Sequence, residues 1–236
     1  MTASIAITVD DLRTKFRREV DDALVGATDD DRLWKDDEIV SFANEALDEW
    51  ARVTRALQET ILLNVVAAEP TVELPTRVLD IQDVYLETSG VTVMPKNANN
   101  VDTGVVADYN GVPLGFQDSL HTGSGTPRCY VRDYDNGDVL RLIPTPILSE
   151  TLKLQATVTI EDNLDEGDDL PRMGIKDQRI VLMYMKYLAY GNQDADTYDL
   201  QRSQTFYSQF EFAAGERELE LRRYRRTPGA VKFSWT

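Results

Sequence analysis

The chain has 236 residues, of which 42 % are hydrophobic and 28 % are charged, and a chain of this kind can bury a sizeable core without crosslinks. One cysteine, Cys129, excludes an internal disulfide framework and a multi-cysteine metal site, and one histidine, His121, removes most histidine-based catalysis and zinc binding. The 25 basic and 41 acidic residues give a net charge of −16, which argues against a general DNA-binding surface.

Neither a membrane segment nor a secretory signal is predicted. No apolar run approaches the roughly 18 residues that are needed to span a bilayer. The start of the chain lacks the basic region followed by an apolar region that marks a secretory signal. We therefore expect a protein that is cytosolic when it is synthesised and has no membrane partner.

Residues 9–53 are predicted to form two amphipathic helices in a hairpin. The first helix is capped by Thr8 or Asp10, and Gly26 with the acidic run 29–31 forms the turn. The apolar residues of the second helix make one stripe of about four turns, because they are spaced i, i+3, i+4, i+7, i+8, i+11 and i+14. They are Ile39, Phe42, Ala43, Ala46, Leu47, Trp50 and Val53.

The second helix is expected to begin in an acidic first turn. Asp36 is its expected N-cap, and Asp37 and Glu38 place negative charge where the helix dipole favours it. Leu33 and Trp34 precede the cap and are expected to fold back onto this turn. Two helices in a hairpin leave apolar surface uncovered, so we expect further helices to pack on the stripe.

From residue 60 to about residue 160 the pattern changes to short strands. They are expected at 61–66, 72–74, 78–86, 91–94, 128–134, 139–143 and 151–161. The strand 78–86 alternates imperfectly, as a bulge would produce, and residues 91–94 are its expected hairpin partner. Asn136-Gly137 favours a type I′ turn between the strands 128–134 and 139–143. The run Pro144-Thr145-Pro146 should then end the second of these strands.

Two segments partly resemble ligand-binding loops, but their residues favour a surface loop and a solvated linker. Residues 96–127 are rich in Asn, Asp and Gly, and Gly123-Ser124-Gly125 lacks the lysine and the helix of a phosphate-binding loop, so a surface loop is favoured. The acidic run 162–169 fails the calcium spacing of an EF-hand, because Leu164 and Met173 would stand at ligand positions 3 and 12. A solvated acidic linker is favoured there.

Helices are predicted again after Leu170-Pro171. One covers residues 177–191 and is unusually apolar and aromatic, and a longer one covers residues 194–225. Aromatic residues at helical spacing are interpreted as core rather than as a cofactor site. We expect the stripe of the second helix to face Tyr184, Leu188, Phe206 and Phe210, which brings the two ends of the chain together.

The C-terminal segment differs from the rest of the chain in charge. Subtracting its five basic residues leaves 20 basic against 41 acidic residues, so residues 1–221 carry −21. Such a basic segment with aromatic residues suits an arm that docks into a partner, and a solvated terminus is the alternative. The predicted docking residues are Arg222, Arg223, Arg225, Arg226, Lys232, Phe233 and Trp235.

The sequence contains no recognisable catalytic or cofactor-binding constellation. Carboxylates are plentiful but scattered, and no metal-ligand spacing, nucleophile elbow or dinucleotide fingerprint is present. We therefore expect a non-enzymatic protein with no cofactor and no metal.

The order of motifs resembles that of the phage head-to-tail adaptor family, including the tail tubular A proteins of short-tailed phages. Two helices open the chain, about a hundred residues of β structure follow, and two helices close it. The motifs that carry the resemblance are Leu33-Trp34-Lys35-Asp36-Asp37-Glu38-Ile39 with Asn44-Glu45-Ala46, the segment 72–81 from Val72-Glu73-Leu74-Pro75, the segment 140–146 ending Pro144-Thr145-Pro146, and Leu170-Pro171.

The resemblance implies an α+β fold, in which the N- and C-terminal helices form a helical bundle with an inserted antiparallel β-sandwich-like domain. The implied parts are residues 1–58 and 166–226 for the bundle, 59–165 for the β domain and 227–236 for a docking tail. It also implies a ring of about twelve copies in the virion neck, assembled in the host cytoplasm, between a portal protein and a nozzle or tail-tube protein. Genome DNA would pass through its channel without specific binding.

Two other functions fit the same residues. One is a different neck or tail-completion protein that caps the tail. The other is an acidic DNA mimic that inhibits a DNA-binding host enzyme, although the basic tail counts against it.

Overall fold

The computed structural model shows an α+β protein and describes residues 7–20, 32–95, 106–107, 113–114, 123–132, 138–160, 164–165, 167–171, 173–192 and 198–226. The chain divides into two compact units. The helical unit comprises Met1–Leu57 and Thr159–Thr236, and the β unit comprises Gln58–Val158.

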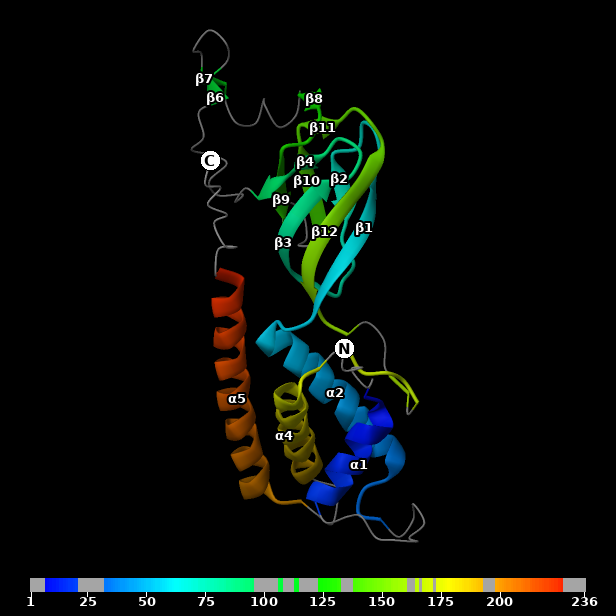
Figure 1. The fold of residues 1–236 in the computed structure, drawn as a ribbon, viewed down its shortest axis with the longest axis vertical. Coiled ribbons are helices and arrows are strands. Elements are labelled where there is room, and N and C mark those ends of the chain that lie inside the picture. Colours follow the sequence, from blue (N-terminus) through cyan, green and yellow to red (C-terminus); the bar gives the residue numbers. More distant parts are fainter. Residues whose placement is uncertain are drawn as a thin grey trace, which may run out of the picture. The chain divides into compact units, whose positions relative to one another are not determined.

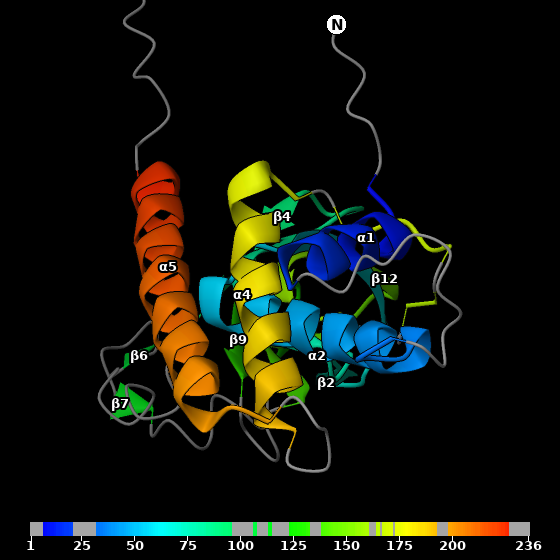
Figure 2. The same ribbon diagram turned by 90° about the horizontal axis from the view of Figure 1, so that it is seen from below.

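The helical unit contains four α-helices in its described residues. They are α1 (Val9–Glu19), α2 (Asp36–Thr54), α4 (Ile175–Gly191) and α5 (Leu200–Arg226). Helix α4 contacts each of the other three, and α5 runs alongside it (Figures 1 and 2). Helices that are distant in the sequence are therefore neighbours in this unit.

One hydrophobic core joins the four helices. Burial of its large side chains removes apolar surface from water at about 25 cal/mol per Å². Trp34 packs its edge against Phe16 and Tyr190, with ring centroids 5.7 Å apart in both pairs. The fully buried members include Leu12, Phe16, Ile39, Leu47, Trp50, Val181, Met185 and Phe210. Of the residues predicted to meet, Phe42 and Tyr184 pack at the margin of this core, while Phe206 stacks on Tyr190.

The start of α1 confirms Thr8 as its cap. The amide of Asp11 donates a hydrogen bond to the Thr8 hydroxyl at 3.3 Å, and the Thr8 amide donates to the Asp11 carboxylate at 3.1 Å. This reciprocal pair satisfies two amides that the helix leaves unbonded. The predicted residues of the turn, Gly26 and 29–31, lie outside the described residues.

The prediction of Asp36 as the cap of α2 is wrong by one residue. Lys35 is the N-cap, and its amide donates to the Glu38 carboxylate at 2.9 Å. Asp36 is the first helical residue. Arg17 donates to its carboxylate at 2.5 Å, and Arg13 lies 3.1 Å from its other oxygen. Arg32 lies 3.5 Å from the same oxygen as Arg13. A carboxylate that is paired with three arginines does not cap the helix amides.

The residues before α2 also differ from the prediction. Trp34 does not simply cover the first turn of its own helix; it is 1 % exposed and lies in the core between α1 and α4. Leu33 is 55 % exposed. The two residues therefore differ, since Trp34 enters the core and Leu33 stays at the surface.

Helix α5 begins later than residue 194. Tyr198 and Asp199 precede the helix, and residues 193–197 lie outside the described residues. The Asp199 carboxylate accepts from the amides of Gln201 and Arg202, at 3.1 and 3.0 Å. Asp199 is thus a helix cap, and a cap fixes the start of a helix more firmly than apolar periodicity does.

The described part of the acidic linker is attached to the first two helices through its backbone. The amide of Val9 donates to the carbonyl of Asp168 at 3.1 Å, and the amide of Leu170 donates to Ile7 at 2.7 Å. The Asn44 side chain exchanges two hydrogen bonds with Leu164, at 2.8 and 3.0 Å. The side chains of Asp165, Asp168 and Asp169 are exposed, as expected, but the segment is not a free linker.

The described residues of the β unit form two four-stranded sheets, of order β1-β12-β3-β4 and β2-β10-β9-β5 (Figure 1). Short strands form two further pairs, β8 with β11 and β6 with β7. The strands are β1 (Gln58–Val65), β2 (Thr71–Glu73), β3 (Val78–Leu86), β4 (Val91–Thr92), β5 (Met94–Pro95), β6 (Val106–Ala107), β7 (Pro113–Leu114), β8 (Ser124–Gly125), β9 (Cys129–Arg132), β10 (Val139–Ile143), β11 (Thr145–Pro146) and β12 (Glu150–Val158).

Strand β3 carries the irregularity that its sequence predicts. Its register against β12 shifts twice, so that Gln82 and Leu79 have no opposite residue. Arg132 donates to the carbonyls of Leu79 and Val78, at 2.9 and 2.8 Å, and so provides hydrogen bonds where the ladder is interrupted. The predicted hairpin with residues 91–94 is confirmed for β4, which pairs Val91–Thr92 with the end of β3.

The segment 123–127 is not only a loop. Ser124 and Gly125 form β8, which pairs in parallel with Thr145 and Pro146 of β11. Two-residue strands carry no periodicity, so the sequence pattern could not reveal this pairing. Strands β9 and β10 form the predicted antiparallel pair, whose turn residues Asn136-Gly137 lie outside the described residues.

Candidate partner-binding site

The predicted docking residues fall at the C-terminal end of α5 and beyond it. Arg222 and Arg223 are exposed residues near the end of the helix, and Arg225 and Arg226 belong to its last turn. The remaining three, Lys232, Phe233 and Trp235, lie outside the described residues. The first four of the predicted docking residues therefore belong to a helix.

One arginine at this end, Arg222, is paired within the helix itself. Arg222 forms an ion pair with Glu218, one helical turn before it, and its side chain is 52 % exposed. Arg223 lines a surface cavity between α4 and α5. An exposed pair of this type contributes under about 1 kcal/mol, so a partner can displace it at little cost.

A buried ionic contact fixes α5 to α4 shortly before this basic end. The Arg217 guanidinium donates two hydrogen bonds to the Asp177 carboxylate, at 2.9 and 3.0 Å. Asp177 is 3 % exposed, and it also accepts from the Trp50 indole at 3.3 Å and from the Gly174 amide at 3.2 Å. The carboxylate thus joins α2, α4 and α5 at one point, which we name the Asp177 clamp.

The clamp extends to the surface through Glu220. Arg217 donates to Glu220 at 3.0 Å, and Lys176 lies 3.4 Å from the same carboxylate. The hydrogen bond from Arg217 holds the pKa of Glu220 below its ordinary value, with Lys176 adding to the effect. The hydrogen bond to Asp177 likewise raises the pKa of Arg217, so this arginine keeps its charge.

Sequence reasoning missed the Asp177 clamp. Asp177 reads as an ordinary acidic residue in the first turn of a helix, and Arg217 as one of many charges on α5. The available hint was the position of an acidic residue beside a strongly apolar run, 40 residues from its partner. Nothing in the sequence specifies that pairing.

A cavity of about 440 Å³ lies beside the clamp. Its apolar floor comes from Ile180, Met183 and Ala213. Charged side chains of both signs form the rest of the lining, namely Lys176, Arg179, Glu216, Arg217, Glu220 and Arg223. An apolar floor inside a charged rim is the usual composition of a protein contact site.

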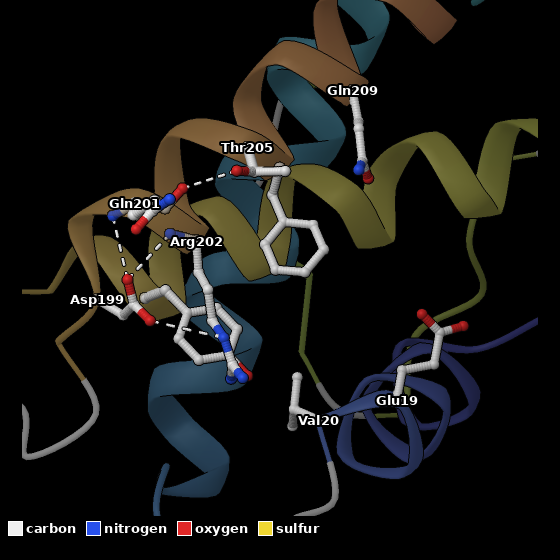
Figure 3. Close-up of a pocket in the computed structure, with 9 residues that line it drawn as sticks. Glu19, Val20, Asp199, Gln201, Arg202, Thr205 and Gln209 are labelled. Carbon is white, nitrogen blue, oxygen red and sulfur yellow. Dashed lines mark hydrogen bonds and ion pairs between the residues drawn. The ribbon is translucent and has the colours of Figure 1, made fainter.

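A second cavity, of about 660 Å³, lies between the ends of α1 and α4 and the start of α5 (Figure 3). Arg202 lies over the Tyr190 ring, 5.5 Å from its centroid, and 3.6 Å from Asp199. Near the end of α1, the Glu19 carboxylate lies 2.5 Å from Lys186 of α4. The charges around this cavity pair with one another, so it offers a partner mainly its polar α5 rim and aromatic floor.

The described residues contain no group of three or more His, Cys, Asp or Glu side chains that could hold a metal ion. Within the same residues, no helix has both the length and the apolar character that a membrane crossing requires. Burial, with the charges of Glu49 and Glu45, raises the pKa of Tyr184 to about 12. This phenol is therefore protonated near neutral pH.

A family model and the curated proteins were compared with the chain, and the family model matches it. No curated protein is similar to the chain. The family model described as SU10 adaptor protein matches residues 7–232, which include every described helix and strand. The chain therefore belongs to the SU10 adaptor protein family, a family of phage adaptor structural proteins.

Proposed function

We propose that this phage adaptor forms a ring beneath the portal, joins the capsid to the tail and leaves a channel for DNA. Family membership supports the adaptor role. The acidic body supports the channel, because a negatively charged wall repels phosphates and does not retain the passing genome. The partners would be the portal protein, a nozzle or tail-tube protein and further copies of the chain, about twelve in all.

The same proposal includes the finer architecture. Residues 1–58 and 166–226 would form one helical bundle, and residues 59–165 a β-sandwich-like insertion, as in the tail tubular A proteins. The core that α1, α2, α4 and α5 share supports the first part. The two four-stranded sheets of the β unit support the second.

The basic tail would dock onto the portal. The observation that carries this proposal is the Asp177 clamp, which fixes α5 at Arg217, about one and a half turns before Arg222. A tail that leaves from a fixed helix end loses less conformational freedom on binding than one that leaves from a free end. Its arginines and aromatic residues are the types that dominate binding energy at protein contacts.

Electron microscopy of the chain mixed with the portal protein of the same phage tests the proposal. The full chain should give a ring on the portal. A chain truncated after Leu221 keeps Arg217 and Glu220 of the clamp, so it should melt normally and yet fail to dock. Phe212→Ala is the matched control, because Phe212 is 69 % exposed on the same helix but lies outside the tail.

The outcomes separate the possible roles. Equal docking by the truncated chain would refute the tail, and no complex with the full chain would refute the portal adaptor. Binding to the tail proteins alone would identify a tail-completion protein instead. Competition with DNA for a basic host enzyme would identify a DNA mimic.

A further inference from the structure

Strand β1 is the long edge of the two main sheets. The other three edges are short, since β4 has two residues, β2 has three, and β5 has two that include Pro95. Strand β1 has eight residues, and all of them face β12 in one uninterrupted register. It lies beside β12 at the edge of the sheet (Figure 1). In the described part of the chain, no strand pairs with its other side.

Little in β1 protects this edge. Natural proteins shield long edges with charges, prolines or bulges, because unpaired amides and carbonyls accept strands from other chains. The run Thr60-Ile61-Leu62-Leu63-Asn64-Val65 has none of these features. The nearest charges are at its start, where Arg77 donates to Glu59 at 2.7 and 3.1 Å.

The two faces of β1 are distinct. Ile61 and Val65 are 7 % and 2 % exposed and belong to the inner face, whereas Leu62 is 62 % exposed on the outer face. A strand added to the edge must continue both faces, and a slip of one residue would exchange them. This requirement limits the registers in which a partner can bind.

We propose that the free edge of β1 pairs antiparallel with β1 of a second copy, about a twofold axis at Leu62. In this register Leu62 lies opposite Leu62, Ile61 opposite Leu63, and Thr60 opposite Asn64. Over residues 60–64 apolar residues meet apolar residues, polar residues meet polar ones, and both faces continue, whereas Glu59 would lie opposite Val65 at the margin of the contact. The edge is therefore complementary to itself, as a twofold contact requires.

The dimer does not depend on the proposed ring. A twofold contact joins two copies and closes, so it cannot also be the repeating contact of a larger ring. The pairing would join the β1-β12-β3-β4 sheets of the two copies into one continuous sheet. It would occupy the exposed edge of β1 in the free protein. It would have to separate if the copies enter a ring, and it is tested with the chain alone.

Thiol crosslinking tests the register. In a Cys129→Ser background, Leu62→Cys should give covalent dimers with a short bismaleimide, because opposite Cβ atoms lie about 4.5–5.5 Å apart. Thr60→Cys should not crosslink to itself, because its copies would lie four residues apart along the strands, about 14 Å. An equal mixture of Thr60→Cys and Asn64→Cys should crosslink.

Sedimentation of the protein with Cys129 intact gives an independent test. Leu62→Lys places like charges opposite each other and should raise the dissociation constant of the dimer at least about tenfold. Gln155→Lys is the matched control, because Gln155 is exposed opposite Thr60 but lies on the central strand β12, and it should leave dimerisation unchanged. A monomer at all concentrations, or self-crosslinking of Thr60→Cys as strong as that of Leu62→Cys, would overturn the proposal.

Discussion

Asp177 is the residue on which the contact between α2, α4 and α5 depends most. Asp177→Asn removes the charge that balances Arg217, whose side chain is 22 % exposed. Removing one partner of a fully buried ion pair typically costs 3–5 kcal/mol. We expect a loss of about 2–3 kcal/mol here, because Arg217 keeps Glu220 and some solvent. Urea denaturation measures the loss.

Glu220→Gln is the control for this prediction. Glu220 contacts the same arginine, at 3.0 Å, but at the surface. Its replacement should cost under about 1 kcal/mol. Equal losses for the two variants would mean that burial of Asp177 contributes nothing special to the clamp.

The lowered pKa of Asp36 predicts how the free energy of unfolding depends on pH. Burial acts to raise the pKa of Asp36, but the hydrogen bond from Arg17 and the charges of Arg13, Arg17 and Arg32 outweigh it, so the pKa lies below 3.8. A carboxyl with a lowered pKa adds stability above its ordinary pKa, and that stability is lost as pH falls through the lowered value. Asp36→Asn should therefore cost about 1–2 kcal/mol from pH 7 to about pH 5.

The comparison of unfolding free energies at several pH values checks this. The difference between the natural chain and Asp36→Asn should shrink below about pH 4. Asp37→Asn removes one charge from the same turn at an exposed position, and so separates the ion pairs from net charge. A difference that stays constant down to pH 3 would contradict the assignment.

At the scale of elements, the sequence predicts what periodicity and turn chemistry encode. Strand β3 has the predicted bounds, and the apolar face of β12, with Leu152, Leu154 and Ala156, is fully buried. Periodicity fails where a polar side chain decides an end, as Asp36 and Asp199 do for α2 and α5. A strand pair as short as β8 and β11 has no period at all.

Two phenylalanines of α5 show how this helix is held. Phe210 is 1 % exposed in the shared core and contacts Tyr184 with ring centroids 4.8 Å apart, whereas Phe212 is 69 % exposed. Phe210→Ala should cost about 3–5 kcal/mol, and Phe212→Ala less than about 0.5 kcal/mol. Thermal or urea unfolding distinguishes them, and similar losses would show that α5 is not packed as described.

At the scale of the whole molecule, the sequence predicts the composition of the parts better than their connections. The order of strands within each sheet depends on pairings such as β1 with β12, which lie about 90 residues apart. The same holds for the candidate site. Charge composition identifies the basic tail from the sequence, whereas the Asp177 clamp depends on a contact between residues that are 40 positions apart. Contacts of this separation leave no local pattern.

The two units have separate cores, which predicts separate unfolding. Trp34 and Trp50 lie in the core of the helical unit, and residues 58–158 contain no tryptophan. The third tryptophan, Trp235, lies outside the described residues, so in a Trp235→Phe background tryptophan fluorescence reports the described helical core. Leu154→Ala empties a fully buried position of the β unit and should cost it about 2–5 kcal/mol. Amide hydrogen exchange should then rise in β1, β3 and β12, while the fluorescence transition stays in place.

Phe210→Ala supplies the converse of this experiment, because it should move the fluorescence transition and leave exchange in the β unit unchanged. If each substitution shifts both probes together, the two units unfold as one cooperative body and the division at residues 58 and 158 has no energetic meaning. If the probes separate, an adaptor can bind partners through one unit without loading the other. Independent units would allow the helical unit, which carries the basic end of α5, and the β unit, which carries the β1 edge, to meet different partners.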